Sequence, residues 1–139
     1  MVQLIVGEKG KGKTKQLLDK VNGQVKDIEG SIVYLDKSTQ HMFELNNKVR
    51  LIDVSQYVIE NSSEFIGFVC GILSQDHDLQ QMYFDSFLKI AVLDVAEMEQ
   101  AVNKLAKLSE KFGVDFILSV SCNESVLPES LKSMVIVSL

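Results

Sequence analysis

Several residue types are scarce in this chain of 139 residues, and each scarcity excludes a class of protein. There is no tryptophan, Arg50 is the only arginine, and 19 acidic residues outnumber 14 basic ones. A protein that binds nucleic acid through its backbone needs a basic face, so the net charge of −5 argues against a nucleic-acid partner. No apolar run approaches the roughly 18 residues of a membrane-spanning helix, so we expect no membrane span.

Cysteine and histidine are also rare. Cys70 and Cys122 lie in apolar runs and are not spaced as a zinc site. The apolar segment before Gly7 is too short, and lacks the basic start, for a secretion signal. We therefore expect a cytoplasmic protein with two buried free thiols. His41 and His77 have no metal-ligand neighbours at suitable spacing, which predicts surface or turn positions for both.

Composition and length favour one globular domain over residues 1–139, with 46% apolar and 24% charged residues. Apolar runs alternate with amphipathic segments, which predicts an α/β fold with a mostly parallel sheet. The core strands are expected at Val2–Val6, Ser31–Leu35, Leu79–Phe84, Val114–Val120 and Met134–Leu139.

Three helices are expected between these strands. The first covers about Gly12–Val21 and ends at Asn22-Gly23, and the second covers about Ser63–Ser74. The third covers about Val95–Phe112, with a capping box from Asp94 and Glu97 and a stop at Gly113. The segment from Ser38 to Val54 is ambiguous: Val49–Val54 is typical of a strand, and we favour a hairpin with Met42–Leu45 over a short helix there.

A glycine-rich loop between the first strand and the first helix carries the clearest chemical signal. Residues 7–14 match G-x-x-x-x-G-K-[ST] at every fixed position. Glycines let the backbone N–H groups wrap an anion, and the following helix points its N-terminus at the same place. The residues expected to bind phosphate are Gly7, Glu8, Lys9, Gly10, Lys11, Gly12, Lys13, Thr14 and Lys15.

On this motif the chain resembles the P-loop NTPase superfamily. The resemblance implies a nucleoside triphosphate with Mg²⁺, in which Lys13 binds the β- and γ-phosphates and Thr14 binds the metal. It also implies a three-layer fold with helices on both faces of the sheet. In the division that is similar to RecA-type and AAA-type ATPases, one strand lies between the P-loop strand and an acidic strand, which predicts a five-stranded core with the order 5-1-4-3-2.

The acidic strand of that division ends in an aspartate that holds Mg²⁺ through water. Three strand-like segments end this way, at Asp36, Asp85 and Asp94. We favour Asp85, because the third core strand fits the expected order and Asp94 already suits a helix cap. Thr14 and Asp85 are therefore the expected metal residues.

The residues expected for hydrolysis are incomplete. The family usually has a glutamate after the metal aspartate, but Ser86 follows Asp85. No general base is identified. Glu8, Asp36 and Ser121 are the candidates for catalytic roles, and Ser119, Ser121 and Asn123 are the candidates for sensing the γ-phosphate.

The leading hypothesis is ATP binding with slow or partner-stimulated hydrolysis, and an unknown protein partner or a homo-oligomer is possible within it. The alternatives are a nucleotide-sensing module without turnover and a small-molecule kinase. A guanine motif is missing, and Arg50 alone cannot supply the arginine clamp of a kinase lid. The chain is also similar to small stand-alone bacterial P-loop proteins labelled twitching-motility-ATPase-like, but it lacks the further motifs of motility ATPases.

Overall fold

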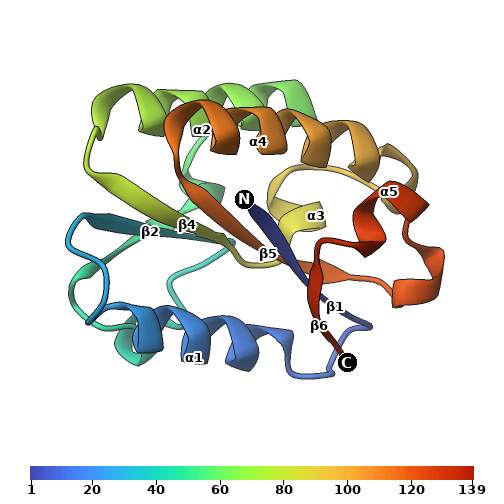
Figure 1. The fold of residues 1–139 in the computed structure, drawn as a ribbon, viewed down its shortest axis with the longest axis horizontal. Helices are drawn as coiled ribbons and strands as arrows, with labels where there is room; N and C mark the ends of the chain where they lie inside the picture. The colour runs from blue at the N-terminus through green and yellow to red at the C-terminus, as the bar shows by residue number, and fades with distance from the viewer.

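A computed structural model describes residues 1–139 and contains one sheet of six parallel strands. Helices cover both faces of the sheet (Figure 1). The strands are β1 (Val2–Gly7), β2 (Ser31–Asp36), β3 (Val49–Asp53), β4 (Leu79–Phe84), β5 (Asp115–Ser121) and β6 (Val135–Ser138). The α/β class and the parallel sheet predicted from the sequence are confirmed.

The order of the strands is β3-β2-β4-β5-β1-β6. The predicted count of five strands is wrong, because β3 adds a sixth strand at the edge beside β2. The five strands expected from the sequence lie in the order β6-β1-β5-β4-β2, which is 5-1-4-3-2 in their own numbering. The sixth strand is β3, which pairs in parallel with β2 from Ile32↔Val49 to Asp36↔Asp53. A single strand, β5, lies between β1 and β4, so the ends of β1 and β4 lie two strands apart.

The predicted hairpin before β3 is also wrong. Met42–Glu44 forms a short 3₁₀ helix, η1, and β3 has no antiparallel partner. The crossover from β2 to β3 is short, but it returns the chain to the starting edge of the sheet, as parallel pairing requires. Sequence alternation alone does not distinguish this crossover from a turn.

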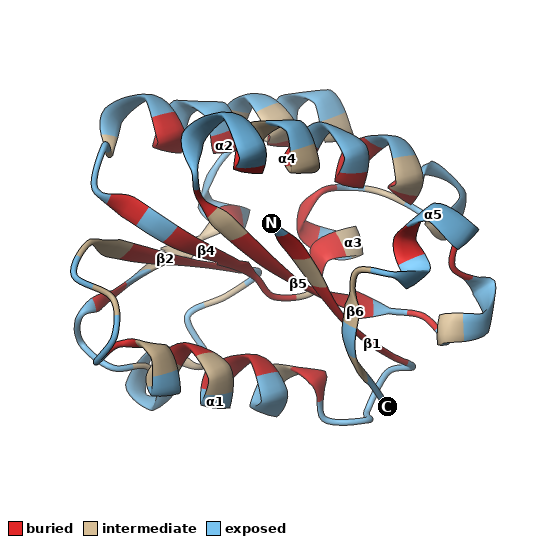
Figure 2. Ribbon diagram, in the orientation of Figure 1, coloured by how far each residue is buried: buried red, intermediate tan, exposed pale blue.

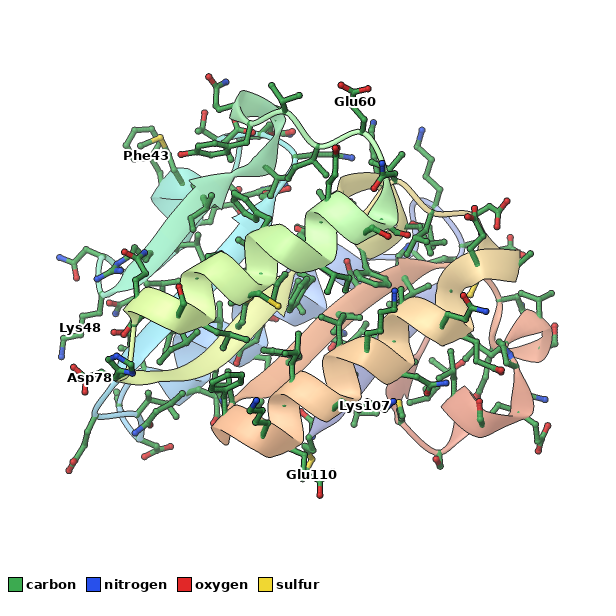
Figure 3. All side chains as sticks on the ribbon, turned by 90° about the horizontal axis from the view of Figure 1, so that it is seen from above. Phe43, Lys48, Glu60, Asp78, Lys107 and Glu110 are labelled. Atoms are coloured by element: carbon green, nitrogen blue, oxygen red, sulfur yellow. The ribbon has the colours of Figure 1, made fainter.

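Two long helices, α2 (Ser62–Gln75) and α4 (Met98–Phe112), lie side by side across one face of the sheet (Figures 1 and 3). The opposite face is covered by α1 (Lys13–Gln24). The short helices α3 (Phe87–Ile90) and α5 (Glu129–Lys132) follow β4 and β5. Three further 3₁₀ turns are η2 (Val54–Gln56), η3 (Val95–Glu97) and η4 (Glu124–Val126).

Alternation along each strand divides the core into two clusters. Along β1, Leu4 and Val6 face the α2 and α4 side, whereas Ile5 packs with Leu17 and Val21 of α1. Because both faces of the central strands are covered, these strands are buried at most positions, as parallel strands usually are, whereas the edge strands β3 and β6 are partly exposed. Figure 2 shows the resulting pattern, in which the strands and the inward sides of the helices are buried.

The predicted capping box and the predicted stop at Gly113 are confirmed, but the predicted stop of α1 is not. Asp94 and Glu97 form the capping box at the start of η3, which leads directly into α4, and Gly113 ends α4 in the left-handed region with φ 66°. The predicted stop at Asn22-Gly23 is wrong, because α1 continues to Gln24. Val21 and Val25 are both buried, and packing of this last turn offsets the low helix propensity of glycine, which costs about 1 kcal/mol.

The cysteines are both free, as predicted, but only Cys122 is buried. Cys70 lies on the outward side of α2 and is exposed. Met82 and Met98 are buried in the core, and Met134 packs against it. The longest helix has 15 residues, and none of the helices combines the length and apolar character that crossing a bilayer requires.

Candidate functional site

The glycine-rich loop joins β1 to α1 at the carboxyl edge of the sheet. Gly10 and Gly12 have φ of +85° and +95°, a region that side chains with a Cβ rarely adopt. Gly12 is the N-cap of α1, and no side chain caps this end of the helix. The first N–H groups of α1 are consequently left for another acceptor, and the helix dipole favours an anion there.

Lys13 begins α1 and is buried, with 8% of its surface exposed. Its ammonium donates a 3.1 Å hydrogen bond to the backbone carbonyl of Glu8, across the loop. Burial lowers the pKa of Lys13, and the attraction of Asp85 opposes that shift. A buried ammonium with one carbonyl partner and a nearby carboxylate is well suited to an anionic ligand, which would supply its missing acceptors.

Asp85 lies directly after β4 and is 2% exposed. Three hydroxyl groups donate to its carboxylate: Thr14 and Ser119 to Oδ1 at 3.1 Å each, and Tyr34 to Oδ2 at 2.8 Å. The predicted metal residues Thr14 and Asp85 are therefore in contact, although 71 residues separate them in the sequence. A hydroxyl and a carboxylate oxygen in contact are ligands that suit Mg²⁺.

Ser86 departs from ordinary backbone geometry. Its φ of 57° and ψ of 55° place it in the left-handed region, and its N–H donates a 2.7 Å hydrogen bond to Ser119 Oγ. Ser119 thus holds the segment after β4 through both Asp85 and Ser86. The sequence predicts Ser119 only as a candidate γ-phosphate sensor, and its buried hydroxyl adds a positioning role that the sequence does not indicate.

A cavity of about 500 Å³ opens between the loop and the ends of β4 and β5. Its wall carries four lysines and one carboxylate, so it attracts anions. The lining residues are Lys9, Gly10, Gly12, Lys13, Thr14, Lys37, Asp85, Ser86, Leu88, Lys89, Ser119 and Ser121. Lys37 and Lys89 were not predicted from the sequence, since neither belongs to a motif and only the sheet order brings them to the loop.

Other predicted site residues lie elsewhere. The wall of the cavity does not include Gly7, Glu8, Lys11 or Lys15. Lys15 forms an exposed ion pair with Asp19, at 3.1 Å. Asn123 accepts a hydrogen bond from the N–H of Ser125, where it caps η4, and only Ser121 of the sensor candidates is both exposed and on the cavity wall.

Asp36 and His41 form a second polar group beside Asp85. One ligand atom from each of these three side chains lies within 4.8 Å of the other two. His41 lies in a turn, as predicted, but the fold gives it two carboxylate neighbours that its spacing in the sequence does not indicate. Pairing of Leu35 with Phe84 brings the ends of β2 and β4 together, and η1 folds His41 back over them.

Asp36 is 1% exposed, and its two oxygens differ. Oδ1 accepts a 2.7 Å hydrogen bond from the N–H of Lys37, whereas Oδ2 is buried without any partner. Burial, followed by repulsion from Asp85, raises the pKa of Asp36 to about 6. A buried carboxylate oxygen without a donor is costly, and it indicates a missing cation or donor.

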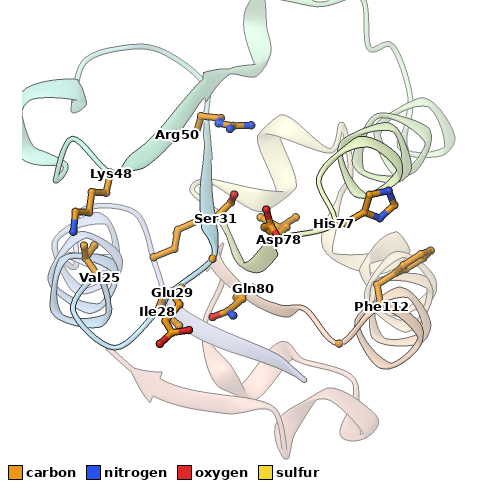
Figure 4. A pocket seen from close by; sticks show the side chains of 14 residues that line it. Val25, Ile28, Glu29, Ser31, Lys48, Arg50, His77, Asp78, Gln80 and Phe112 are labelled. Atoms are coloured by element: carbon orange, nitrogen blue, oxygen red, sulfur yellow. The ribbon is translucent and has the colours of Figure 1, made fainter.

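A larger pocket of about 900 Å³ lies at the opposite edge of the sheet, where the strands begin (Figure 4). Arg50 and His77 are on its wall, and Arg50 pairs with Asp76 at 3.6 Å. The pocket contains neither the loop nor an unpaired helix N-terminus. We place the functional site at the smaller cavity, because the chemical groups converge there, and Arg50 belongs to the far edge.

A scan against models of known protein families finds no match for this chain, and a search of curated proteins finds no match either. Its function is therefore inferred from its own residues and their geometry.

Proposed function

We propose that this protein belongs to the P-loop NTPase superfamily and binds a nucleoside triphosphate, with ATP as the expected nucleotide, together with Mg²⁺ in the cavity at the glycine-rich loop. The observation that carries the proposal is the uncapped N-terminus of α1 beside the buried Lys13. Backbone N–H groups, a helix dipole and an ammonium together supply what a polyphosphate needs.

Two residues of the cavity wall have the oxygen ligands that Mg²⁺ requires. Thr14 offers a hydroxyl ligand, and Asp85 offers a carboxylate that would act through water. A bound Mg²⁺ would neutralise charge on the phosphates. Lys9, Lys37 and Lys89 surround the same space and would add three further cations around the phosphate chain.

Turnover is proposed to be slow unless a partner supplies a missing group. The position after Asp85 holds Ser86, whose hydroxyl is a poor base. Glu8 is exposed and is not on the cavity wall. Asp36 is the carboxylate beside Asp85 with a free oxygen, but burial disfavours its charged form. The lack of a general base also supports the alternative of a nucleotide-sensing module that binds without turnover.

A small-molecule kinase remains a second candidate because of an adjoining pocket. This pocket of about 290 Å³ shares Lys37 and Lys89 with the cavity and is otherwise lined mainly by apolar side chains, among them Val54, Tyr57 and Val92. Such a pocket could hold a phosphate acceptor next to the expected γ-phosphate. Conversion of ATP to ADP without release of phosphate, only in the presence of a metabolite fraction, would favour this candidate.

Calorimetry with Mg·ATP tests nucleotide binding. Lys13→Ala removes a charge-assisted contact worth roughly 1.5–3 kcal/mol, so affinity should fall about ten- to a hundredfold. Lys15→Ala is the matched control, because Lys15 lies two residues away but pairs with Asp19 on the surface. If the two substitutions lower the Mg·ATP affinity equally, or if Lys13→Ala leaves it unchanged, the glycine-rich loop is not the nucleotide site.

A further inference from the structure

We propose that Asp36, His41 and Asp85 form a binding site for a divalent transition-metal ion, separate from the Mg²⁺ that accompanies the nucleotide. The proposal does not depend on nucleotide binding. It begins with the free oxygen of Asp36, which is buried, has no hydrogen-bond donor and lies in a group with a second carboxylate and an imidazole.

A side-chain movement of about an ångström would close the group around one ion. Ligand atoms that share a metal at about 2.0–2.2 Å in a tetrahedral site lie about 3.3–3.6 Å apart. The three ligand atoms here lie within 4.8 Å of one another without an ion, so the longest separation would have to shorten by up to about 1.5 Å. His41 can make that shift, since its side chain is 23% exposed and belongs to a short 3₁₀ segment rather than to the sheet.

Glu44 contacts the imidazole of His41 and orients it as a metal ligand. Its Oε1 lies 3.2 Å from Nδ1 of His41, one turn further along η1. A proton on Nδ1 shared with the carboxylate leaves the Nε2 lone pair free, and metal-binding histidines are usually held by such a carboxylate. Asp36, His41 and Asp85 would then be the ligands, with Glu44 holding the imidazole.

The donor set selects the class of ion. Two carboxylate oxygens with one imidazole nitrogen suit Zn²⁺, Co²⁺ or Mn²⁺ better than Mg²⁺, which favours oxygen ligands and water. Affinity should rise from Mn²⁺ to Co²⁺, following the usual order for mixed nitrogen and oxygen sites. The group shares Asp85 with the Thr14 and Asp85 pair, but its other two ligands, Asp36 and His41, lie outside the glycine-rich loop.

The test uses the full chain without nucleotide, first treated with a chelator and then titrated with Zn²⁺ by calorimetry and with Co²⁺ by visible absorption. We expect one ion per chain, with a Co²⁺ spectrum that changes from that of the hydrated ion. His41→Gln and Asp36→Asn should each weaken binding at least tenfold, and Glu44→Gln should weaken it by about ten- to a hundredfold.

Two control variants distinguish this site from metal binding elsewhere on the chain and from the nucleotide site. His77→Gln removes the other histidine, at the far edge of the sheet, and should leave the metal affinity unchanged. Lys13→Ala should weaken Mg·ATP binding and leave Zn²⁺ binding intact, so the two proposals can fail independently. Absence of Zn²⁺ and Co²⁺ binding at millimolar concentration, or equal losses in His41→Gln and His77→Gln, would overturn the metal site.

Discussion

The hydroxyl of Tyr34 donates a 2.8 Å hydrogen bond to Oδ2 of Asp85, between two side chains that are both buried. Tyr34 lies in β2 and Asp85 follows the neighbouring strand β4. Burial, followed by the charge of Asp85, raises the pKa of the Tyr34 hydroxyl, so this group stays a donor. The bond fixes one oxygen of Asp85 while Thr14 and Ser119 share the other.

Tyr34→Phe should therefore destabilise the fold. The substitution leaves a buried carboxylate oxygen without its donor, and hydrogen bonds to charged groups contribute about 1.5–3 kcal/mol. Urea denaturation at pH 7 measures the loss. Tyr83→Phe is the matched control, because Tyr83 stacks against Tyr34 at 6.1 Å and donates to the neutral amide oxygen of Gln81. Tyr83→Phe should lower the free energy of unfolding by only about 0.5–1.5 kcal/mol. Equal losses in the two variants would mean that the hydrogen bond to Asp85 stabilises the fold no more than a hydrogen bond to a neutral group.

Gly12→Ala should damage the loop, whereas Gly23→Ala should not. At Gly12 a Cβ would occupy a left-handed backbone with φ +95°, at a cost of roughly 1–2 kcal/mol, and relaxation would misdirect the N–H groups of α1. Gly23 lies inside α1 with open space around its Cα, so alanine there should stabilise the helix by about 0.5–1 kcal/mol. Denaturation and Mg·ATP calorimetry on both variants check this, and tolerance of Gly12→Ala in both assays would contradict it.

Much of this arrangement could be predicted from the sequence. The strand and helix periodicity located β4 without error and located α2 and α4 to within a few residues, because each segment is long and strongly patterned. The eight-residue motif located the loop, because its glycines and lysine have few other uses in that spacing. Asp85 was favoured over Asp36 on an expected strand order, and the structure places it against Thr14.

The remainder depends on contacts between distant residues. Tyr34 is one apolar residue in a buried strand until β2 and β4 pair, and only then does its hydroxyl meet Asp85. His41 belongs to no motif, and it joins Asp36 and Asp85 because η1 folds back over two strand ends. Lys37 and Lys89 reach the cavity in the same way. Register and loop closure determine these contacts, and the periodicity of one segment does not show which residue of another segment it will contact.

Asp36 should make the metal-free fold less stable as pH rises. Its folded pKa of about 6 exceeds the usual value of 3.8, so the folded state holds the proton more tightly than the unfolded state. Stability is therefore lost between about pH 4 and pH 6 and stays reduced above that range. In the presence of a chelator, Asp36→Asn should raise the free energy of unfolding at pH 7.5 by on the order of 1–2 kcal/mol, allowing for solvent screening, and by little at pH 3.5.

Asp53 supplies the control with the opposite sign. It lies opposite Asp36 in the register of β2 and β3, and a hydrogen bond from the side chain of Ser55 lowers its pKa. A lowered pKa contributes stability at neutral pH that is lost on acidification. Asp53→Asn should therefore cost stability at pH 7.5 and not at low pH. Denaturation of both variants across pH 3.5–7.5 decides the matter, and parallel pH profiles would mean that Asp36 is not the group that titrates near 6.

The isolated protein should hydrolyse ATP slowly, at less than about one turnover per minute. General-base catalysis contributes about 10² to 10⁴-fold, and Ser86 cannot supply it at the position after Asp85.

Ser86→Glu should raise the rate if the new carboxylate lies beside the attacking water. Any side chain at position 86 must accept the left-handed backbone with φ 57°, so Ser86→Gln is the control: it carries the same strain and nearly the same volume without the charge. A steady-state assay of phosphate release compares the three proteins. A gain with glutamate alone would assign the missing group to this position, and equal rates for glutamate and glutamine would show that charge there is irrelevant. Wild-type turnover of several per second without a partner would mean that the protein already has a base, and Asp36→Asn and Glu8→Gln would then identify which carboxylate provides it.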